Sequence, residues 1–242
     1  VPWAKLGLAK THFMTGAFDQ AETELTELIG QNAQFVEAYD WLARTQEAQG
    51  TLENAHESLA RATQLSPHGL QRQRRIGEME MTLGQPETAE KRLAEVVRQS
   101  RYSDFRDPED HVRLVRAQLG CGATDRAQNT LRDLEHSMQG QSKAELCKAV
   151  CAAMVFARQG NQEKAAAAAK RAASLLDPRL NASLQLKKEV TRVCLDQGLE
   201  AQAATVAMDI MRNAPNEKAV EDVKGMLIQM GKAELGESLA NR

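Results

Sequence analysis

Residue types that could carry catalysis or hold a metal are sparse in this 242-residue sequence. Cys147 and Cys151 are four residues apart and would share one face of a helix, but no Cys-x-x-Cys pair or nearby histidine completes a zinc site. The sequence contains no nucleophile elbow, phosphate-binding loop, dinucleotide fingerprint or His-Glu-x-x-His motif. We therefore predict no catalysis by this chain, no cofactor and no bound metal. The two cysteines are interpreted as small packed thiols, with a redox role as the alternative.

Basic side chains recur six residues before regularly spaced glycines and form the pattern most suggestive of binding. The residues at this position are Lys10, Arg44, Glu78, Arg116, Met154 and Arg192. Nine or ten residues before a glycine, the same helical face also carries Arg74, Arg75, Arg113 and Lys188. Because arginine can donate two hydrogen bonds to one carboxylate, this face predicts a groove that binds an acidic or carboxylate-bearing peptide. The candidate groove residues are Lys10, Arg44, Arg74, Arg113, Arg116 and Arg192. Asp40 and Glu189 interrupt the face, so the alternative is a solvated surface whose charges pair between repeats.

The elements that must position these side chains are predicted to be helices. Ala, Leu, Gln, Glu, Arg and Lys dominate the composition, whereas aromatic residues make up only 4%. Six glycines recur at intervals of 34 or 38 residues: Gly16, Gly50, Gly84, Gly122, Gly160 and Gly198. Five residues after each of them is an alanine: Ala21, Ala55, Ala89, Ala127, Ala165 and Ala203.

Apolar or small residues also recur nine and twelve residues after each glycine, and for the most part seven and eight residues before it. Spacings of three and four place these residues on one helical face. We predict six helical hairpins that turn at the glycines, where a Cβ atom would be strained, and that pack most closely at the alanines. One hairpin cannot bury its apolar face alone, so neighbouring hairpins must stack.

This pattern resembles the tetratricopeptide repeat (TPR) family. The second unit carries the resemblance most fully, with Tyr39, Leu42, Ala43, Gly50, Leu52, Ala55, Leu59, Ala62 and Pro67. Units four to six keep the glycine and alanine positions but run four residues longer and lack the aromatic ones. The resemblance implies an all-α fold, a right-handed α-α superhelix (TPR solenoid) that forms a single domain over 1–242 and binds proteins in its concave groove. The predicted repeats are 1–34, 35–68, 69–104, 107–142, 145–180 and 183–217, followed by a C-terminal cap at 218–242 in which Gly236 replaces the alanine.

Three stretches, at 3–9, 38–43 and 65–74, also look like bacterial TPR-containing response regulators. In that family a receiver domain precedes the repeats, and a chain that begins with Val1 rather than Met is expected to be a piece of a longer polypeptide. The resemblance implies an adaptor or output module in two-component signalling. The alternatives are a TPR scaffold of an assembly or export machine, and the substrate-recruiting arm of an enzyme whose catalytic domain lies outside this chain.

The charge balance and hydropathy exclude several classes of partner. Lysine and arginine total 31 against 33 acidic residues, a net charge of −2, which predicts neither a nucleic-acid nor a membrane partner. The apolar runs are far shorter than the ~20 residues that span a bilayer, and no signal peptide is visible. We therefore predict a cytoplasmic chain whose partner is a protein or peptide, with self-association as an open alternative.

Aromatic residues are few, so each position carries weight. Trp41 is interpreted as core packing, with a place at the groove as the alternative. Tyr102 and Phe105 lie among basic residues between the third and fourth units and are interpreted as an insert that packs its own aromatics, with a nucleic-acid contact as the alternative. The alanine run at 165–169 is interpreted as tight packing of the second helix of unit five.

Overall fold

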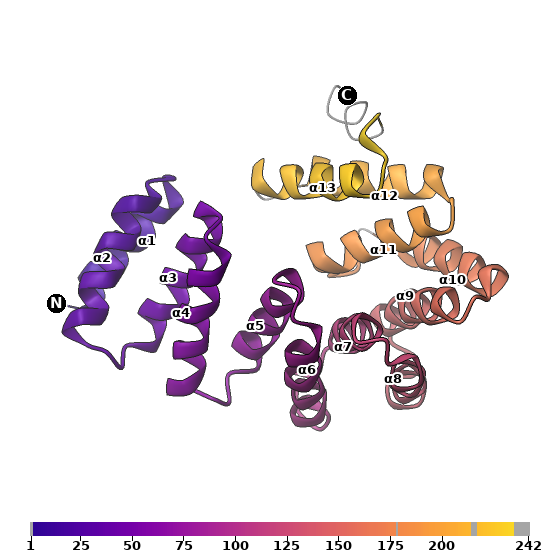
Figure 1. The fold of residues 1–242 in the computed structure, drawn as a ribbon, viewed down its shortest axis with the longest axis horizontal. Helices are drawn as coiled ribbons and strands as arrows, with labels where there is room; N and C mark the ends of the chain where they lie inside the picture. Colours follow the sequence, from indigo (N-terminus) through magenta and orange to yellow (C-terminus); the bar gives the residue numbers. More distant parts are fainter. Residues whose placement is uncertain (1, 178, 214–216, 235–242) are drawn as a thin grey trace. The chain divides into compact units, whose positions relative to one another are not determined.

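The computed structural model describes residues 2–177, 179–213 and 217–234, and the regular structure in these ranges is entirely α-helical. The helices form two compact units, Val1–Arg106 and Asp107–Arg242 (Figure 1). The N-terminal unit contains α1 (Pro2–Met14), α2 (Phe18–Gln31), α3 (Val36–Gln49), α4 (Leu52–Leu65), α5 (Leu70–Thr82) and α6 (Pro86–Ser100). The C-terminal unit contains α7 (Glu109–Gly120), α8 (Thr124–Ser137), α9 (Ser142–Arg158), α10 (Gln162–Leu175), α11 (Leu184–Asp196), α12 (Glu200–Arg212) and α13 (Glu217–Gln229).

Successive helices pack in pairs, α1 with α2 through α11 with α12, which confirms the six predicted hairpins. Helix α13 follows and packs on α12; it begins at Glu217, one residue before the segment predicted as the cap. The predicted Gly236 lies outside the described residues. That both units form one continuous superhelical domain stays a prediction.

Each hairpin turns at a glycine in the left-handed conformation. At Gly50, φ is +84°, the Gly50 N–H donates to the Glu47 carbonyl at 3.2 Å, and the Thr51 N–H donates to the Gln46 carbonyl at 2.9 Å. These bonds satisfy carbonyls that the end of α3 leaves without helical partners. All six predicted hinge glycines have positive φ: Gly16, Gly50, Gly84, Gly122, Gly160 and Gly198.

The predicted close-packing positions are also confirmed. The six alanines that follow the hinge glycines are fully buried: Ala21, Ala55, Ala89, Ala127, Ala165 and Ala203. The apolar residues nine and twelve positions after each glycine are buried as well. At the position eight residues before the hinge glycine, two residues differ from the expectation: Leu8 is 45% exposed, because the packing of α1 on α2 and α3 leaves this side chain uncovered, and Ala152 is partly exposed.

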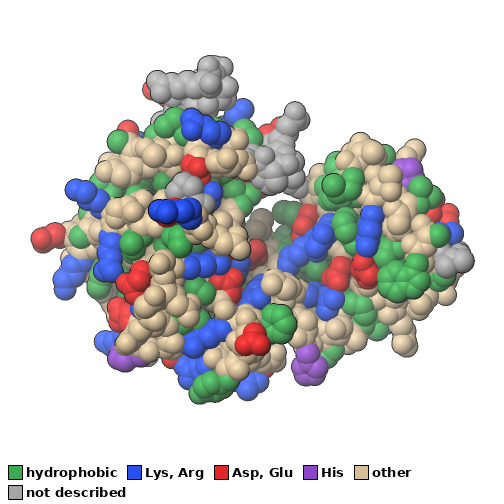
Figure 2. Space-filling model, turned by 180° about the vertical axis from the view of Figure 1, so that it is seen from behind, with side chains coloured by type: hydrophobic (Ala, Val, Ile, Leu, Met, Phe, Trp, Pro, Cys, Tyr) green, Lys and Arg blue, Asp and Glu red, His purple; other side chains and the backbone are tan. Residues whose placement is uncertain are grey.

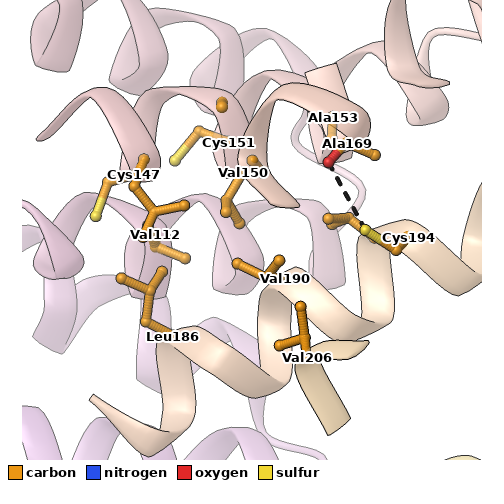
Figure 3. Packing of buried hydrophobic residues seen from close by; sticks show 14 of the residues in the cluster. Val112, Cys147, Val150, Cys151, Ala153, Ala169, Leu186, Val190, Cys194 and Val206 are labelled. Atoms are coloured by element: carbon orange, nitrogen blue, oxygen red, sulfur yellow. Dashed lines mark hydrogen bonds between the residues drawn. The ribbon is translucent and has the colours of Figure 1, made fainter. Parts of the chain in front are cut away.

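The core of the C-terminal unit is one cluster of small and branched apolar side chains from α7 to α13, of which Figure 3 shows a part. Cys147 and Cys151 lie on adjacent turns of α9 inside this cluster, and the Cys194 thiol lies 3.7 Å from the Ala169 carbonyl oxygen. Burial raises the pKa of Cys194 to about 11 and also raises the pKa of both α9 thiols. The interpretation of Cys147 and Cys151 as packed thiols is confirmed.

The segment that follows α6 differs from its prediction. Tyr102 is 95% exposed and Phe105 is also exposed, so the expectation that this insert packs its own aromatics was wrong. The segment is held through its backbone instead, because the Phe105 carbonyl accepts a hydrogen bond from Arg74 at 2.7 Å. Over the residues that the structure describes, no helix combines the length and the apolar character that a bilayer span requires.

Candidate partner-binding site

The first helices of the N-terminal hairpins, α1, α3 and α5, are joined by ion pairs between neighbouring helices. The Lys10 ammonium on α1 lies 2.6 Å from the Glu37 carboxylate on α3. Arg72 on α5 forms a two-pronged pair with Asp40 at 2.7 and 2.8 Å, and its pKa is raised chiefly by this hydrogen bond. Basic side chains of α1 and α5 therefore form ion pairs with acidic side chains of α3, which belongs to a neighbouring repeat. This is the arrangement that the alternative interpretation of the basic face predicts.

Arg74, a predicted groove residue, is buried rather than exposed on a binding surface. Its guanidinium donates to the Phe105 carbonyl and so anchors the segment that follows α6. An arginine enclosed in this way and already bonded to the chain is poorly placed to reach a ligand.

Arg44 differs from its basic neighbours. It is exposed, and among the described residues no carboxylate forms an ion pair with it. Its guanidinium carbon lies 4.8 Å from the centre of the Trp41 ring, and the Lys10 ammonium lies 5.1 Å from the same centre. Phe13 supports the indole in an edge-on contact at 5.5 Å. We call Lys10, Trp41 and Arg44 the Trp41 site.

The Trp41 site can recognise an anion. Stacking on an aromatic face orients a guanidinium and leaves its N–H edge available for a carboxylate. Trp41 itself is half-buried and packs against the apolar cluster of α1, α2 and α3, so it serves both the core and the surface. Its pairing with Arg44 was missed from sequence, although the two residues lie three apart on one predicted helix, a spacing that places them side by side.

The predicted groove residues of the C-terminal unit are bonded to internal carboxylates. Arg116 on α7 and Arg192 on α11 both donate to Glu189, at 2.6 Å and at 2.9 and 3.0 Å. Gln185 adds a third donor at 2.9 Å, and only 3% of the Glu189 side chain is exposed. Glu189 therefore links α7, the first helix of the fourth hairpin, to α11, the first helix of the sixth hairpin.

A second buried carboxylate, Glu109, engages Arg113. Glu109 lies 3.4 Å from Arg113 and 2.7 Å from Lys143, and it accepts hydrogen bonds from the backbone and hydroxyl of Ser183. Asp110 contacts Arg113 as well, at 3.2 Å.

Between α7 and α11, the side chains around these two carboxylates leave a cavity of about 10 Å³, which has room for roughly one water molecule. In the C-terminal unit, the arginines that were predicted to bind a peptide are therefore bonded to Glu189 and Glu109.

The predicted groove residues thus have different environments in the two units. The structure brings Lys10 and Arg44 together at Trp41, and it brings Arg116 and Arg192 together at Glu189. Figure 2 shows lysine and arginine side chains interspersed with acidic ones rather than gathered in a uniform basic field. Within the described residues, no group of three or more His, Cys, Asp or Glu side chains is placed to hold a metal ion.

The fold matches that of solved TPR structures. A tetratricopeptide repeat protein from Parabacteroides merdae aligns with a TM-score of 0.64 and 13% identity, over 94% of this chain and 84% of that one. PilW, described as a type IV pilus biogenesis factor, aligns with a TM-score of 0.56 and 15% identity, over 92% and 98% of the two chains. YrrB, described as a TPR protein with an unusual peptide-binding site, has the same TM-score and identity over 73% and 87%.

No protein-family model and no curated protein sequence matches the chain. The structural likeness confirms the predicted fold class, an α-α superhelix of the TPR type. At these identities it establishes the fold, and function has to be argued from the site.

Proposed function

We propose that the chain is a non-catalytic scaffold that binds a carboxylate-bearing peptide segment of a partner protein at the Trp41 site. The observation that carries this proposal is the state of Arg44: its guanidinium is exposed and stacked on Trp41, while basic groups on the neighbouring helices are held by acidic partners. The TPR fold supports the proposal because stacked hairpins present extended surfaces suited to binding other proteins.

The two cations of the site have different roles. Lys10 is already held by Glu37, so most of its charge is balanced within the protein. Arg44 has no such partner among the described residues, so a ligand carboxylate can take both of its outward N–H groups without breaking an internal bond. The half-buried indole offers apolar contact beside the charge, which favours a ligand that combines an acidic group with an apolar side chain.

The test is the loss of binding to acidic peptides. Peptides selected from a random display library against the full chain would be measured by fluorescence anisotropy, each beside an Asp/Glu to Asn/Gln version. We expect Arg44→Gln to weaken the acidic peptides at least tenfold, because a charge-assisted bidentate contact contributes about 1.5–3 kcal/mol. Arg61→Gln on α4, which changes an exposed arginine bonded to Gln64, is the matched control.

Trp41 also provides a direct readout. In a Trp3→Phe background the remaining tryptophan is Trp41, and bound peptide is expected to change its fluorescence. Selected peptides that lack acidic groups, or that bind Arg44→Gln as tightly as the unchanged chain, would contradict the proposal.

For the wider setting, we propose that this scaffold is the cytoplasmic output module of a bacterial two-component response regulator, a role supported by the sequence resemblance alone. The pilus role stated for PilW supports the alternative of a scaffold in an assembly machine. Determining the parent polypeptide upstream of Val1 tests this. The response-regulator role requires about 120 residues of alternating strand and helix with an aspartate at the end of an apolar strand. A signal peptide or an unrelated catalytic domain would contradict it.

A further inference from the structure

A second candidate surface lies in the C-terminal unit, on both helices of its second hairpin, α9 and α10, and on the preceding helix α8. It is a groove of about 550 Å³ lined by residues of α8, α9 and α10. Its apolar lining includes Ala152 and Phe156 from α9 and Ala168 from α10. This volume falls in the range of pockets that bind drug-sized ligands.

The groove lies where repeat five lacks a polar side-chain pair that is present at the equivalent place in repeats two to four. In repeats two to four, the residue four positions before the hinge glycine bonds to the residue eight positions after it. The pairs are Gln46 with Ser58 at 2.8 Å, Glu80 with Arg92 at 2.8 Å, and Gln118 with Thr130 at 2.9 Å. In repeat five these positions are Phe156 and Ala168, and both line the groove.

A second difference between repeat five and its neighbours lies in the same groove. Eight residues before the hinge glycine, the neighbouring hairpins carry Leu114 and Val190, which are buried, whereas repeat five carries Ala152, which is partly exposed in the groove. Tight packing was the interpretation of the alanine run at 165–169, and it holds for Ala165 and Ala169, which are fully buried. It does not hold for 167 and 168, which line the groove.

The charges around the groove are unequal. Lys148 and Arg171 share a single carboxylate, Glu145, at 2.8 and 2.9 Å. Lys164 lies 5.7 Å from the centre of the Phe156 ring, and no carboxylate within the described part of the chain forms an ion pair with it. The lining of α9 and α10 therefore carries a net positive charge, while α8 contributes the acidic Glu135.

We propose that this groove binds an amphipathic helix of a partner protein, with its apolar face on Ala152, Phe156 and Ala168 and acidic side chains toward Lys164 and Arg171. The backbone groups of α9 and α10 are bonded within their own helices, so an extended peptide would find no backbone partners along them. A helix satisfies its own backbone, and small side chains on the receiving surface let it approach closely.

The test uses two designed 18-residue helical peptides that share a leucine and alanine face and differ only in their flanks, which carry glutamate in one and lysine in the other. Binding to the full chain would be measured by fluorescence anisotropy. We expect the glutamate peptide to bind at least tenfold more tightly than the lysine peptide. Lys164→Glu, an exposed change, should remove this preference.

A substitution that fills the groove gives a second, independent test of the proposal. Ala168→Leu should weaken the glutamate peptide at least tenfold, whereas Ala201→Leu, at an exposed alanine on α12, should leave binding unchanged. Thermal unfolding followed by circular dichroism shows whether each variant is folded. If Ala168→Leu does not fold, the proposal is tested by Lys164→Glu alone. Arg44→Gln should have no effect, which separates this surface from the Trp41 site.

Equal binding of the two peptides, binding of neither, or unchanged binding by folded Ala168→Leu would overturn the proposal. A concentration-dependent dimer that Ala168→Leu abolishes would assign the groove to a second copy of the chain, which would also overturn it.

Discussion

Replacing Glu189 with glutamine tests whether Arg116 and Arg192 stabilise the fold or bind a ligand. The side chain of Glu189 is 3% exposed and accepts hydrogen bonds from both arginines and from Gln185. Breaking a fully buried ion pair costs about 3–5 kcal/mol. Arg116 is 20% exposed and Arg192 is 39% exposed, so water screens part of each interaction. We therefore expect the free energy of unfolding to fall by about 2–3 kcal/mol.

The assay is urea denaturation of the full chain followed by circular dichroism. Glu163→Gln, at an exposed position in the first turn of α10, is the control and should cost less than about 1 kcal/mol. A loss below about 0.5 kcal/mol for Glu189→Gln would refute the structural assignment. If the same variant bound acidic peptides more tightly, the two arginines would be groove residues after all, as the sequence pattern predicted.

The remaining predictions concern the hairpins and the thiols. Ala55→Leu should lower the free energy of unfolding by about 1–3 kcal/mol, because the alanine is fully buried between the two helices of its hairpin; an unchanged denaturation midpoint would contradict the packing. Gly50→Ala should cost about 1–2 kcal/mol because φ is +84°, and Gly225→Ala in α13, where φ is not positive, should show no such loss. Iodoacetamide at pH 8 should label Cys121 and spare the buried thiols until urea unfolds the chain, as read by mass spectrometry; rapid labelling of Cys151 in the folded chain would contradict its burial and raised pKa.

The fold was predictable because the features that define it are local and repeated. A hinge glycine and an alanine five residues later specify the turn and the close approach within one hairpin, and six copies make the pattern visible. Leu8 was mispredicted because its burial depends on what packs against α1, which the repeat alone does not determine.

The site was only partly predictable because charge pairing is not local. Arg44 and Arg116 occupy the same position in their repeats, yet Arg44 stacks on Trp41 whereas Arg116 is bonded to Glu189, 73 residues away. Helical spacing indicates that each side chain lies on the equivalent face of its own helix. It does not indicate which of them meets a carboxylate on another helix, since that depends on how closely the hairpins approach one another.

The bond between Arg116 and Glu189 also constrains how this chain can evolve. Repeat proteins commonly gain or lose units because each hairpin contacts only its neighbours, so an extra copy disturbs little. Here Arg116 on α7 and Glu189 on α11 are bonded across the intervening α9–α10 hairpin, and Glu109 reaches Ser183 across the same hairpin. Duplicating or deleting that hairpin would separate both pairs, and it would leave Glu189 bonded only within α11 and remove the contact of Glu109 with Ser183. We therefore expect the insertion or removal of a hairpin to cost more stability in this unit than in an array whose hairpins contact only their neighbours.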